Sequence, residues 1–343
     1  MRFHIAVNLE RVRPNIDMRE VRDHTLEMIK IADQAGFEMA WAAEHHALEM
    51  TIAPNPFHLM TYWAHHTKQI HVGCGVVNAA YWHPIKLAGE AALCDLLTDG
   101  RMALGIGSGA YQREFDRMFP GLKQQDSWQY MQEMLPLIKK LWSGDVEHKG
   151  QFWSFPKATS CPKPLQKNIP IWVGARSPIT FDYAVKNNCH IMSWPLTLPL
   201  SEVKKYRAML DDSIMRHNKN YQKTFALMRH TAVYKDDDDR QAVLKSLRQV
   251  LAQFGNLMTK SGDVVNGYPD EVALETLEGN VRVDPLMLEE NLMLGTPKQV
   301  IDKLKKYQDM GVDAFIYYAS MGLDMARQKK SLRLFIDEVL SKF

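Results

Sequence analysis

The stretch PIWVGARSPIT, residues 170–180, contains a complete transition from a strand to a helix. Its first part is apolar and rich in residues that favour a buried strand, and Gly174 and Ala175 then permit a tight turn. Ser177 suits the N-cap of a helix, and Pro178 suits the first helical position. The stretch therefore predicts a strand whose C-terminal end leads directly into a helix, which is the repeating unit of α/β proteins.

The same alternation runs along the whole chain and predicts eight strands, each followed by a helix. The expected strands are 3–9, 39–43, 70–77, 102–107, 170–175, 189–194, 225–233 and 315–320. The expected helices are 19–35, 55–66, 84–98, 127–142, 178–187, 201–216, 240–253 and 329–342. Eight such units with parallel pairing and right-handed crossovers predict a single (β/α)8 TIM barrel over residues 1–343. An open, doubly wound sheet is the alternative.

Two segments are longer than ordinary connections and are expected to be insertions. Residues 143–169 are rich in Pro, Gly and aromatic side chains, and residues 255–296 carry several Gly and Pro turns. Long loops in a compact domain often form lids over a functional site. We expect 255–296 to be a mobile lid, with a simple surface excursion as the alternative.

The bulk composition is that of a soluble globular protein. The 343 residues are 46% hydrophobic and 24% charged, with a net charge of +2, so neither nucleic acid nor an anionic membrane is an expected partner. The four cysteines are widely spaced without a CxxC pair, which is typical of a reducing compartment. With no signal peptide and no long apolar run, we expect a cytoplasmic protein that acts on a small molecule.

The C-terminal ends of barrel strands and the loops after them normally form the active site. One of these ends is GARSPIT, where Arg176 adds a permanent charge and Ser177 and Thr180 add hydroxyls beside a helix N-terminus. That combination favours phosphate binding, although a plain capped helix start is the alternative. The Gly-rich GIGSG at 105–109 lacks the full GxGxxG pattern, so a dinucleotide-binding fingerprint is not supported.

A second strand end carries the triplet Glu44-His45-His46. Two histidines alone do not make a metal site, and no HExxH motif is present, so we expect no metal. A histidine at the rim is better suited to general acid–base chemistry. Because side chains alternate along a strand, only one of His45 and His46 is expected to face the barrel axis.

Several motifs in order along the chain resemble the bacterial luciferase family, the luciferase-like flavin monooxygenases. They are GFEMAWAAEHH (36–46), NPF (55–57), VGCGVVNAAYWHP (72–84), GRMALGIGSGAYQREFDRMFPG (100–121), PIWVGARSPIT (170–180), IMSW (191–194) and LGTPKQVIDKL (294–304). The resemblance covers nearly the whole length and implies a (β/α)8 barrel that binds FMN at its C-terminal face.

The resemblance also implies roles for individual residues. His45 matches the active-site histidine and Glu44 the acidic residue beside it, so these two are the expected catalytic residues. Gly75 and Val76 match the position of a cis peptide bond beside the flavin ring. The expected cofactor-binding residues are Gly75, Val76, Asn78, Ser108, Tyr111, Gly174, Ala175, Arg176, Ser177, Thr180 and Trp194.

One departure from the family concerns the phosphate group. Where luciferases carry a Cys-Arg pair, this chain has Gly107-Ser108, so the phosphate arginine is missing there. Arg176 stands where luciferases have an acidic residue. We hypothesise that Arg176 replaces the lost positive charge.

The implied function is an FMN-dependent monooxygenase that uses reduced flavin and O2 through a C4a-(hydro)peroxyflavin to oxygenate a small organic substrate. Electrons would come from NAD(P)H, either directly or through a separate flavin reductase. A homodimer is expected, with the face near the second and third strands and their helices as interface. The alternatives are an F420-dependent dehydrogenase or reductase of the same superfamily, a non-catalytic flavin-binding protein and a metal-dependent barrel hydrolase.

Overall fold

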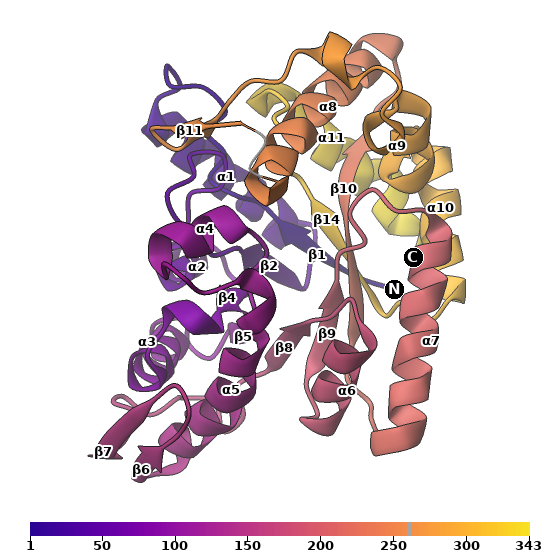
Figure 1. Cartoon of the computed structure of the whole chain (residues 1–343). Coiled ribbons are helices and arrows are strands. Elements are labelled where there is room, and N and C mark those ends of the chain that lie inside the picture. Colours follow the sequence, from indigo (N-terminus) through magenta and orange to yellow (C-terminus); the bar gives the residue numbers. More distant parts are fainter. Residues whose placement is uncertain (260–261) are drawn as a thin grey trace.

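The computed structural model describes residues 1–259 and 262–343 and contains a closed barrel of eight parallel strands (Figure 1). Strand β1 pairs with both β2 and β14, and β10 pairs with both β9 and β14, so the sheet has no open edge within the ring. The TIM barrel is confirmed, and the open doubly wound sheet is wrong. The barrel strands are β1 (Arg2–Ala6), β2 (Met39–Ala42), β3 (His71–Cys74), β5 (Met102–Gly107), β8 (Ile171–Gly174), β9 (His190–Ser193), β10 (Phe225–Val233) and β14 (Ala314–Tyr318).

Helices surround this ring, as expected for parallel strands that each need a covering layer. They are α1 (Met18–Gln34), α2 (Pro56–His65), α3 (Pro84–Leu97), α4 (Gln112–Met118), α5 (Trp128–Ser143), α6 (Pro178–Lys186), α7 (Leu200–His217), α8 (Asp237–Thr259), α9 (Pro285–Asn291), α10 (Pro297–Asp309) and α11 (Met325–Leu334). The two chain ends meet at one side, where the rings of Phe3 and Phe343 lie 5.6 Å apart.

The structure corrects several expected boundaries. The strand expected at 70–77 ends at Cys74, and a separate short strand, β4 (Val77–Asn78), pairs with β5. Helix α8 extends the expected 240–253 at both ends, and α11 begins earlier than 329. The seven-residue helix α4 was not expected, because it is too short to show a helical period in the sequence.

Both long segments contain secondary structure of their own. Residues 143–169 include an antiparallel hairpin of β6 (Val146–Lys149) and β7 (Ser154–Ala158). Residues 255–296 include a second hairpin, β11 (Val264–Val265) with β12 (Tyr268–Pro269), then α9 and β13 (Met293–Gly295), which pairs with β10. Residues 260–261 of the expected lid lie outside the described residues. In the part of the chain that is described, no helix has both the length and the apolarity needed to cross a membrane.

The expected lid touches the loop after β2. The backbone N–H of Glu49 donates to the carbonyl of Gly267 at 3.0 Å. The end of α8 contributes Leu257 to a small apolar cluster with Leu48 and Tyr111. The segment therefore packs against the rim of the barrel near the triplet 44–46.

Candidate active site

A cavity of about 390 Å³ lies at the C-terminal end of the barrel. It is lined by the ends of most barrel strands, which is where the fold normally places an active site. Every residue expected from the sequence to act or to bind a cofactor lines this one cavity. These residues are Glu44, His45, Gly75, Val76, Asn78, Ser108, Tyr111, Gly174, Ala175, Arg176, Ser177, Thr180 and Trp194.

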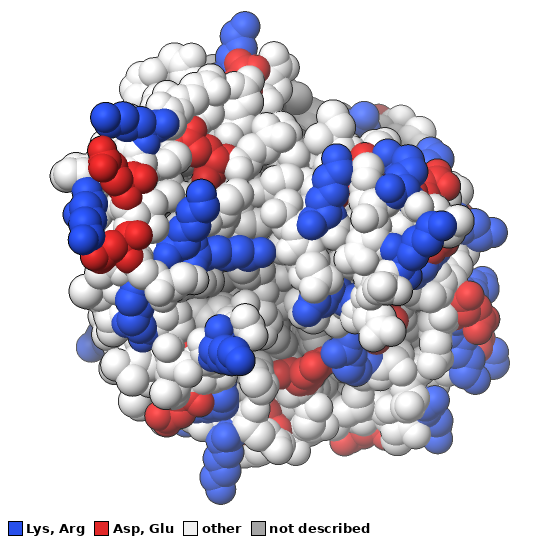
Figure 2. All heavy atoms as spheres, turned by 90° about the horizontal axis from the view of Figure 1, so that it is seen from below, with Lys and Arg blue, Asp and Glu red and all other residues white. Residues whose placement is uncertain are grey.

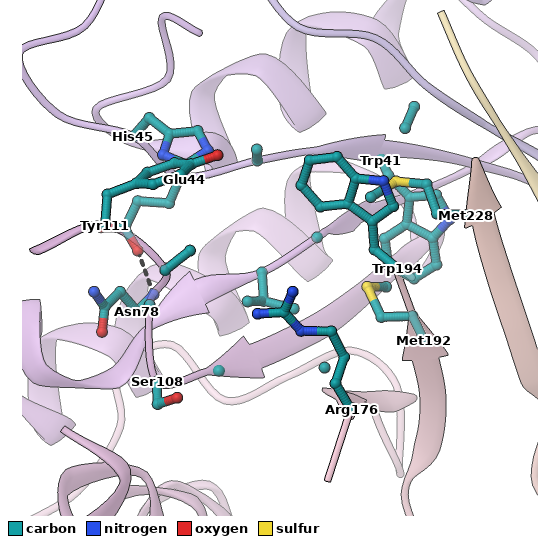
Figure 3. A pocket seen from close by; sticks show the side chains of 18 of the residues that line it. Trp41, Glu44, His45, Asn78, Ser108, Tyr111, Arg176, Met192, Trp194 and Met228 are labelled. Carbon is teal, nitrogen blue, oxygen red and sulfur yellow. Dashed lines mark hydrogen bonds between the residues drawn. The ribbon is translucent and has the colours of Figure 1, made fainter. Parts of the chain in front are cut away.

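The carboxylate of Glu44 is buried and holds neighbouring segments together. It accepts a hydrogen bond from the backbone N–H of Asn78 at 2.5 Å (Figure 3). It accepts a second from the indole N–H of Trp82 at 2.9 Å. Its oxygen Oε1 also lies 2.8 Å from Nε2 of His46. Both carboxylate oxygens are thus engaged, and they fix the loop between β3 and α3 against the end of β2.

The side chain of His45 lines the cavity, whereas that of His46 turns to Glu44 and does not line it. This is the alternation expected from the sequence. Nδ1 of His45 lies 3.2 Å from Oε2 of Glu114, a buried residue in the first turn of α4. No other described group forms a hydrogen bond with the ring of His45, so Nε2 has no protein partner in the described chain.

Two opposing effects set the pKa of His45. Burial lowers the pKa, because it disfavours the charged imidazolium. The charge of the Glu114 carboxylate and its hydrogen bond act in the other direction and outweigh burial, so the pKa of His45 is raised above its usual value near 6.5. The pair therefore favours a protonated imidazole at the cavity wall.

Glu114 is the functional candidate that sequence reasoning missed. It is separated from His45 by 69 residues, and it lies in the unexpected helix α4. Its Oε1 also accepts the backbone N–H of His46 at 2.7 Å, so one carboxylate orients two consecutive residues. The sequence offered one signal for Glu114. It is a carboxylate that follows shortly after the Gly-rich C-terminal end of β5, and that strand end lies at the rim of the barrel.

The opposite side of the cavity carries the expected anion-binding group. Arg176 extends from the end of β8 toward the centre of the cavity, and Ser108 comes from the loop after β5 (Figure 3). No carboxylate in the described chain forms an ion pair with Arg176. The hydroxyl of Thr180 accepts the backbone N–H groups of Arg176 and Ser177, each at 3.1 Å, and thus fixes the turn.

Between these two ends the cavity wall is largely apolar. Trp41, Met192, Trp194 and Met228 line it (Figure 3). Val76, Ile316 and Tyr318 complete this apolar wall. The indole nitrogen of Trp194 is buried and has no hydrogen-bond partner in the described chain. Such a wall suits a flat aromatic group that meets a few polar atoms at its edges.

The loop after β3 contains a cis peptide bond between Gly75 and Val76. The glycines at the end of β5 let the backbone there pack closely against this loop and against Asn78. A Cβ at Gly107 would lie 2.6 Å from Cγ2 of Val76. At Gly109, which has φ +77°, a Cβ would lie 2.3 Å from the amide nitrogen of Asn78. The glycines of GIGSG are therefore needed for packing against the cavity loop.

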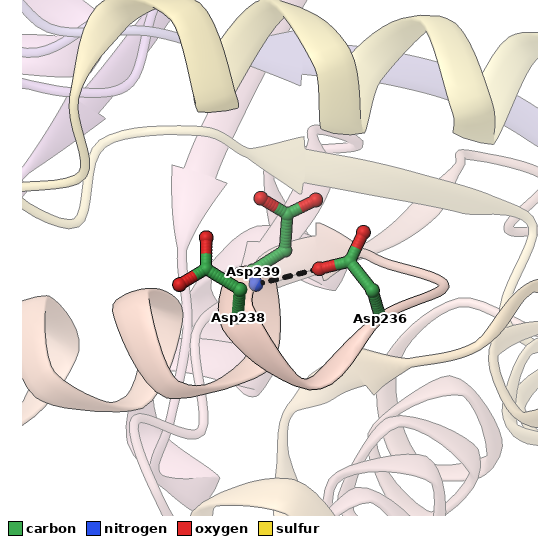
Figure 4. Close-up of side chains that lie close together, drawn as sticks. All are labelled: Asp236, Asp238 and Asp239. Atoms are coloured by element: carbon green, nitrogen blue, oxygen red, sulfur yellow. Dashed lines mark hydrogen bonds between the residues drawn. The ribbon is translucent and has the colours of Figure 1, made fainter.

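A group of three acidic side chains at the start of α8 does not line this cavity. Asp236, Asp238 and Asp239 lie close together at the start of α8, where Asp236 accepts the backbone N–H of Asp239 at 2.9 Å (Figure 4). Arg327 forms ion pairs with Asp238 and Asp239, and Lys330 pairs with Asp236 and Asp239. These contacts account for the cluster as a helix start neutralised by basic side chains.

Charged side chains are interspersed on the molecular face seen in Figure 2. Lys and Arg side chains are the more prominent there, with Asp and Glu side chains between them.

Comparison with known proteins places these observations in a family. The sequence profile described as luciferase-like monooxygenase matches residues 1–314. The oxygenase component of flavin-dependent trigonelline monooxygenase from Acinetobacter baylyi is 38% identical over 344 residues, which cover 100% of this chain and 96% of that protein.

Two solved structures share the fold. The oxygenating constituent of 3,6-diketocamphane monooxygenase from Pseudomonas putida, in complex with FMN, has a TM-score of 0.76 and 19% identity over 100% of this chain and 99% of that one. An F420-dependent secondary alcohol dehydrogenase, in complex with an F420-acetone adduct, has a TM-score of 0.76 and 16% identity, covering 98% of each chain. Because both identities are low and the reactions differ, these two structures show the fold alone.

Proposed function

The chain belongs to the luciferase-like monooxygenase family and is a flavin-dependent monooxygenase, and we propose that it is the oxygenase component of a two-component system. In this proposal the enzyme uses reduced FMN and O2 to oxygenate a small organic substrate. The observation that supports it best is a single cavity with the His45–Glu114 pair at one end and, at the other, Arg176, which has no ion-pair partner in the described chain. The match of the family profile and the 38% identity to the Acinetobacter protein confirm the family resemblance that the motifs indicated.

The residues around the cavity fit a flavin mononucleotide. The volume of about 390 Å³ falls in the range of roughly 300–1,000 Å³ that is usual for cofactor sites. We propose that the apolar wall with Trp41 and Met192 holds the ring system. Arg176, Ser108 and the hydroxyl of Ser177 would hold the phosphate, since a guanidinium provides several charged hydrogen-bond donors for it.

The hydroxyl of Thr180 already donates to the carbonyl of Ser177 at 2.8 Å. We therefore propose that Thr180 shapes the phosphate-binding turn, rather than serving as a donor to the phosphate. The same reasoning applies to Glu44, whose two oxygens are occupied. We propose that Glu44 holds the site together and that His45 carries the acid–base role.

A bound reduced flavin supplies the electron pair with which O2 is activated. His45 would hold a proton in the wall of the cavity in which the flavin binds. Glu114 accepts the Nδ1–H of His45, and the protonated ring then offers its Nε2–H to the cavity. A histidine held in this way can donate a proton to the oxidised product or take one from the substrate.

Exclusion of water is the second contribution of the protein. Phe254 of α8 lines the cavity and stacks on Tyr111, with ring centroids 5.8 Å apart. We propose that segment 255–296 belongs to the same single domain and acts as a mobile lid, so that its closure over the rim shields the site from solvent.

Two observations support a separate protein as the source of electrons. GIGSG lacks the pattern of a dinucleotide-binding loop, and the similar Acinetobacter protein is named as an oxygenase component. We propose that a separate reductase uses NAD(P)H and delivers reduced FMN to this protein in the cytoplasm. Direct reduction of the bound flavin by NAD(P)H is the outcome that would contradict this arrangement.

We further propose that the protein is a homodimer through the face that carries α2 and α3. On α3, Leu93, Leu96 and Leu97 are 42%, 46% and 44% exposed. Three neighbouring leucines on one helix form an apolar surface that association would cover.

The decisive experiment for the proposed function starts without oxygen. The protein is mixed with chemically reduced FMN, O2 is admitted, and the absorbance spectrum is followed with time. We expect reoxidation with a phase that free FMN does not show, altered in His45→Ala. Trigonelline, the compound in the name of the Acinetobacter protein, is the first substrate to test, with ¹⁸O2 as the source of any oxygen found in the product.

Reoxidation identical to that of free FMN would contradict the proposed function. F420 binding would then be measured, since the F420-dependent alcohol dehydrogenase has the same fold. F420 binding together with hydride transfer would support the dehydrogenase alternative. Flavin binding without any effect on reoxidation would support a non-catalytic flavin-binding protein.

A further inference from the structure

The order of the strands defines two sides of the active-site cavity. Around the ring the strands follow one another as β1, β2, β3, β5, β8, β9, β10 and β14, so β1 lies opposite β8 and β14 lies opposite β5. Ser108 and Arg176, the proposed phosphate ligands, follow β5 and β8. The side formed by β10, β14 and β1 is therefore the one farthest from the proposed phosphate group, and it has no part in the proposed binding of FMN.

Two side chains that carry polar groups, Asn8 and Tyr318, lie on this far side. The amide nitrogen of Asn8 donates to the hydroxyl of Tyr318 at 2.9 Å, and the backbone N–H of Asn8 donates to Oγ of Ser320 at 2.8 Å. The end of β14 and the chain after β1 are thus held together at this point. The other residues of these three strands that line the cavity have apolar side chains: Ala6, Met228 and Ile316.

The ring of Tyr318 is fixed by aromatic neighbours. It stacks on the imidazole of His230, with centroids 4.5 Å apart and planes 27° apart, and it meets Trp194 edge-on at 5.6 Å. Tyr318 lines the cavity although only 7% of it is exposed. The phenol is therefore held in one orientation before a ligand binds, which lowers the entropic cost of binding.

The hydrogen bond from Asn8 decides how the hydroxyl of Tyr318 can act. An amide nitrogen carries only donors, so the phenol oxygen is the acceptor in this contact, and its own hydrogen remains for another partner. No other group in residues 1–259 and 262–343 forms a hydrogen bond with this hydroxyl. Burial raises the pKa of Tyr318, so the O–H group keeps its hydrogen throughout the neutral pH range.

The hydroxyl of Tyr318 faces the same space as that of Tyr111, which also lines the cavity. Burial raises the pKa of Tyr111, and the phenol of Tyr318 raises it further. Such an effect requires the two phenol groups to lie near each other, since the interaction between charges falls with distance. The O–H of Tyr318 is thus a donor at the cavity wall.

We propose that Tyr318 donates a hydrogen bond to a carbonyl oxygen of a small aromatic substrate, and that Asn8 is the positioning residue that leaves the O–H available. This inference rests on the proposed function, because it takes the phosphate side of the cavity as given. A carbonyl oxygen supplies the acceptor that the phenol lacks, and Met228 and Ile316 cover the apolar part of the same molecule. The far side then selects compounds with a ketone, amide or carboxyl group over hydrocarbons of the same shape.

The test compares acetophenone with ethylbenzene, which has nearly the same shape without the carbonyl group. Both are titrated calorimetrically into the protein saturated with oxidised FMN, after the binding of FMN itself has been measured. We expect acetophenone to bind, and Tyr318→Phe to weaken its binding about threefold to tenfold, as for the loss of one hydrogen bond. The same variant should change the affinity for ethylbenzene less than twofold.

Tyr317→Phe is the matched control for Tyr318→Phe. Tyr317 is the preceding residue of β14, its hydroxyl lies 2.8 Å from Oγ of Ser331, and it does not line the cavity. The affinities of this variant for both compounds should stay within twofold of those of the unaltered protein.

Asn8→Asp tests the direction of the hydrogen bond. The new carboxylate can only accept, so the O–H of Tyr318 should turn to it, and acetophenone should bind more weakly although the hydroxyl is still present. If Tyr318→Phe does not fold, this second variant decides.

Three results would overturn the inference alone: FMN binding without acetophenone binding, equal losses of affinity for both compounds in Tyr318→Phe, or unchanged acetophenone affinity in Asn8→Asp. A protein that does not bind FMN would contradict the proposed function, and with it this inference. Measurement of FMN binding at the start therefore separates the two failures.

Discussion

Nδ1 of His45 lies 3.2 Å from Oε2 of Glu114, while the other oxygen of the same carboxylate accepts the backbone N–H of His46 at 2.7 Å. One buried side chain of α4 thus fixes both the ring orientation and the backbone of the strand end that carries His45. The contact also raises the pKa of His45, so a single geometric relationship defines its position and its protonation state.

Loss of this contact should change the pH dependence of catalysis. In Glu114→Gln the imidazole loses its negative neighbour, so we expect the limb of the kcat profile that reports His45 to move to lower pH. His45→Gln should lower turnover by about 10²–10⁴-fold, the usual contribution of a general acid–base group. Glu133→Gln is the control, because it removes the carboxylate of a comparable pair with His148 that lies outside the cavity. If the same limb of the kcat profile does not move in Glu114→Gln, it does not report a His45 paired with Glu114.

The same pair should contribute to stability in a pH-dependent way. Because the pKa of His45 is raised in the folded state, its contribution is fully present below the unfolded value near 6.5 and is lost as pH rises through the folded value. Glu114→Gln should therefore cost more unfolding free energy at pH 6 than at pH 9, by about 1.4 kcal/mol for each pKa unit. Urea unfolding at both pH values measures this, and an equal cost at the two pH values would count against it.

Arg176 should govern affinity for the phosphate of FMN. In Arg176→Ala we expect FMN binding to weaken about 10-fold to 100-fold, as for loss of a hydrogen bond to a charged group. Riboflavin, which lacks the phosphate, should bind the variant and the unaltered protein alike. Arg216→Ala removes an exposed arginine that pairs with Asp182 and should have no effect. Flavin fluorescence titration measures the affinity of each variant for FMN and for riboflavin. An unchanged affinity of Arg176→Ala for FMN would reject the hypothesis that Arg176 replaces the missing phosphate arginine.

Gly107 should be required for the shape of the cavity loop. In Gly107→Ala the new methyl group would meet Cγ2 of Val76 at 2.6 Å, and we expect a loss of about 1–3 kcal/mol of stability together with weaker flavin binding. Gly144→Ala is the control, since a Cβ there meets nothing within 4 Å. Thermal unfolding and flavin titration test both variants, and equal behaviour would show that the loop accommodates the methyl group.

The exposed leucines of α3 should hold the proposed dimer together. We expect Leu93→Lys with Leu97→Lys to shift the protein from dimer to monomer in size-exclusion chromatography with light scattering. Leu286→Lys, at a 71% exposed position on α9, should leave the oligomeric state unchanged. A dimer that survives the double substitution would place the interface elsewhere.

Much of the site could be predicted because the fold itself brings strand ends together. Arg176 lies on the rim for a local reason, since the stretch 170–180 already specifies a strand, a turn and a capped helix. The alternation of side chains along a strand predicted that only one of His45 and His46 faces the barrel axis, and the family resemblance selected His45. The structure places all of the expected site residues in one cavity, although the role of each stays a proposal.

Other features depended on contacts that no local pattern contains. The role of Glu44 changed once its three hydrogen bonds to Asn78, Trp82 and His46 were visible. Glu114 was missed, because α4 has only seven residues and too few turns to show a period.

The sequence by itself determined the order of strands and helices, the closed barrel and the rim on which His45 and Arg176 lie, because propensity, capping and side-chain alternation act over a few neighbouring residues. Only the tertiary structure decided that Glu114 meets His45. That distance depends on how α4, from a distant part of the chain, packs against the barrel, and the raised pKa of His45 follows from that packing.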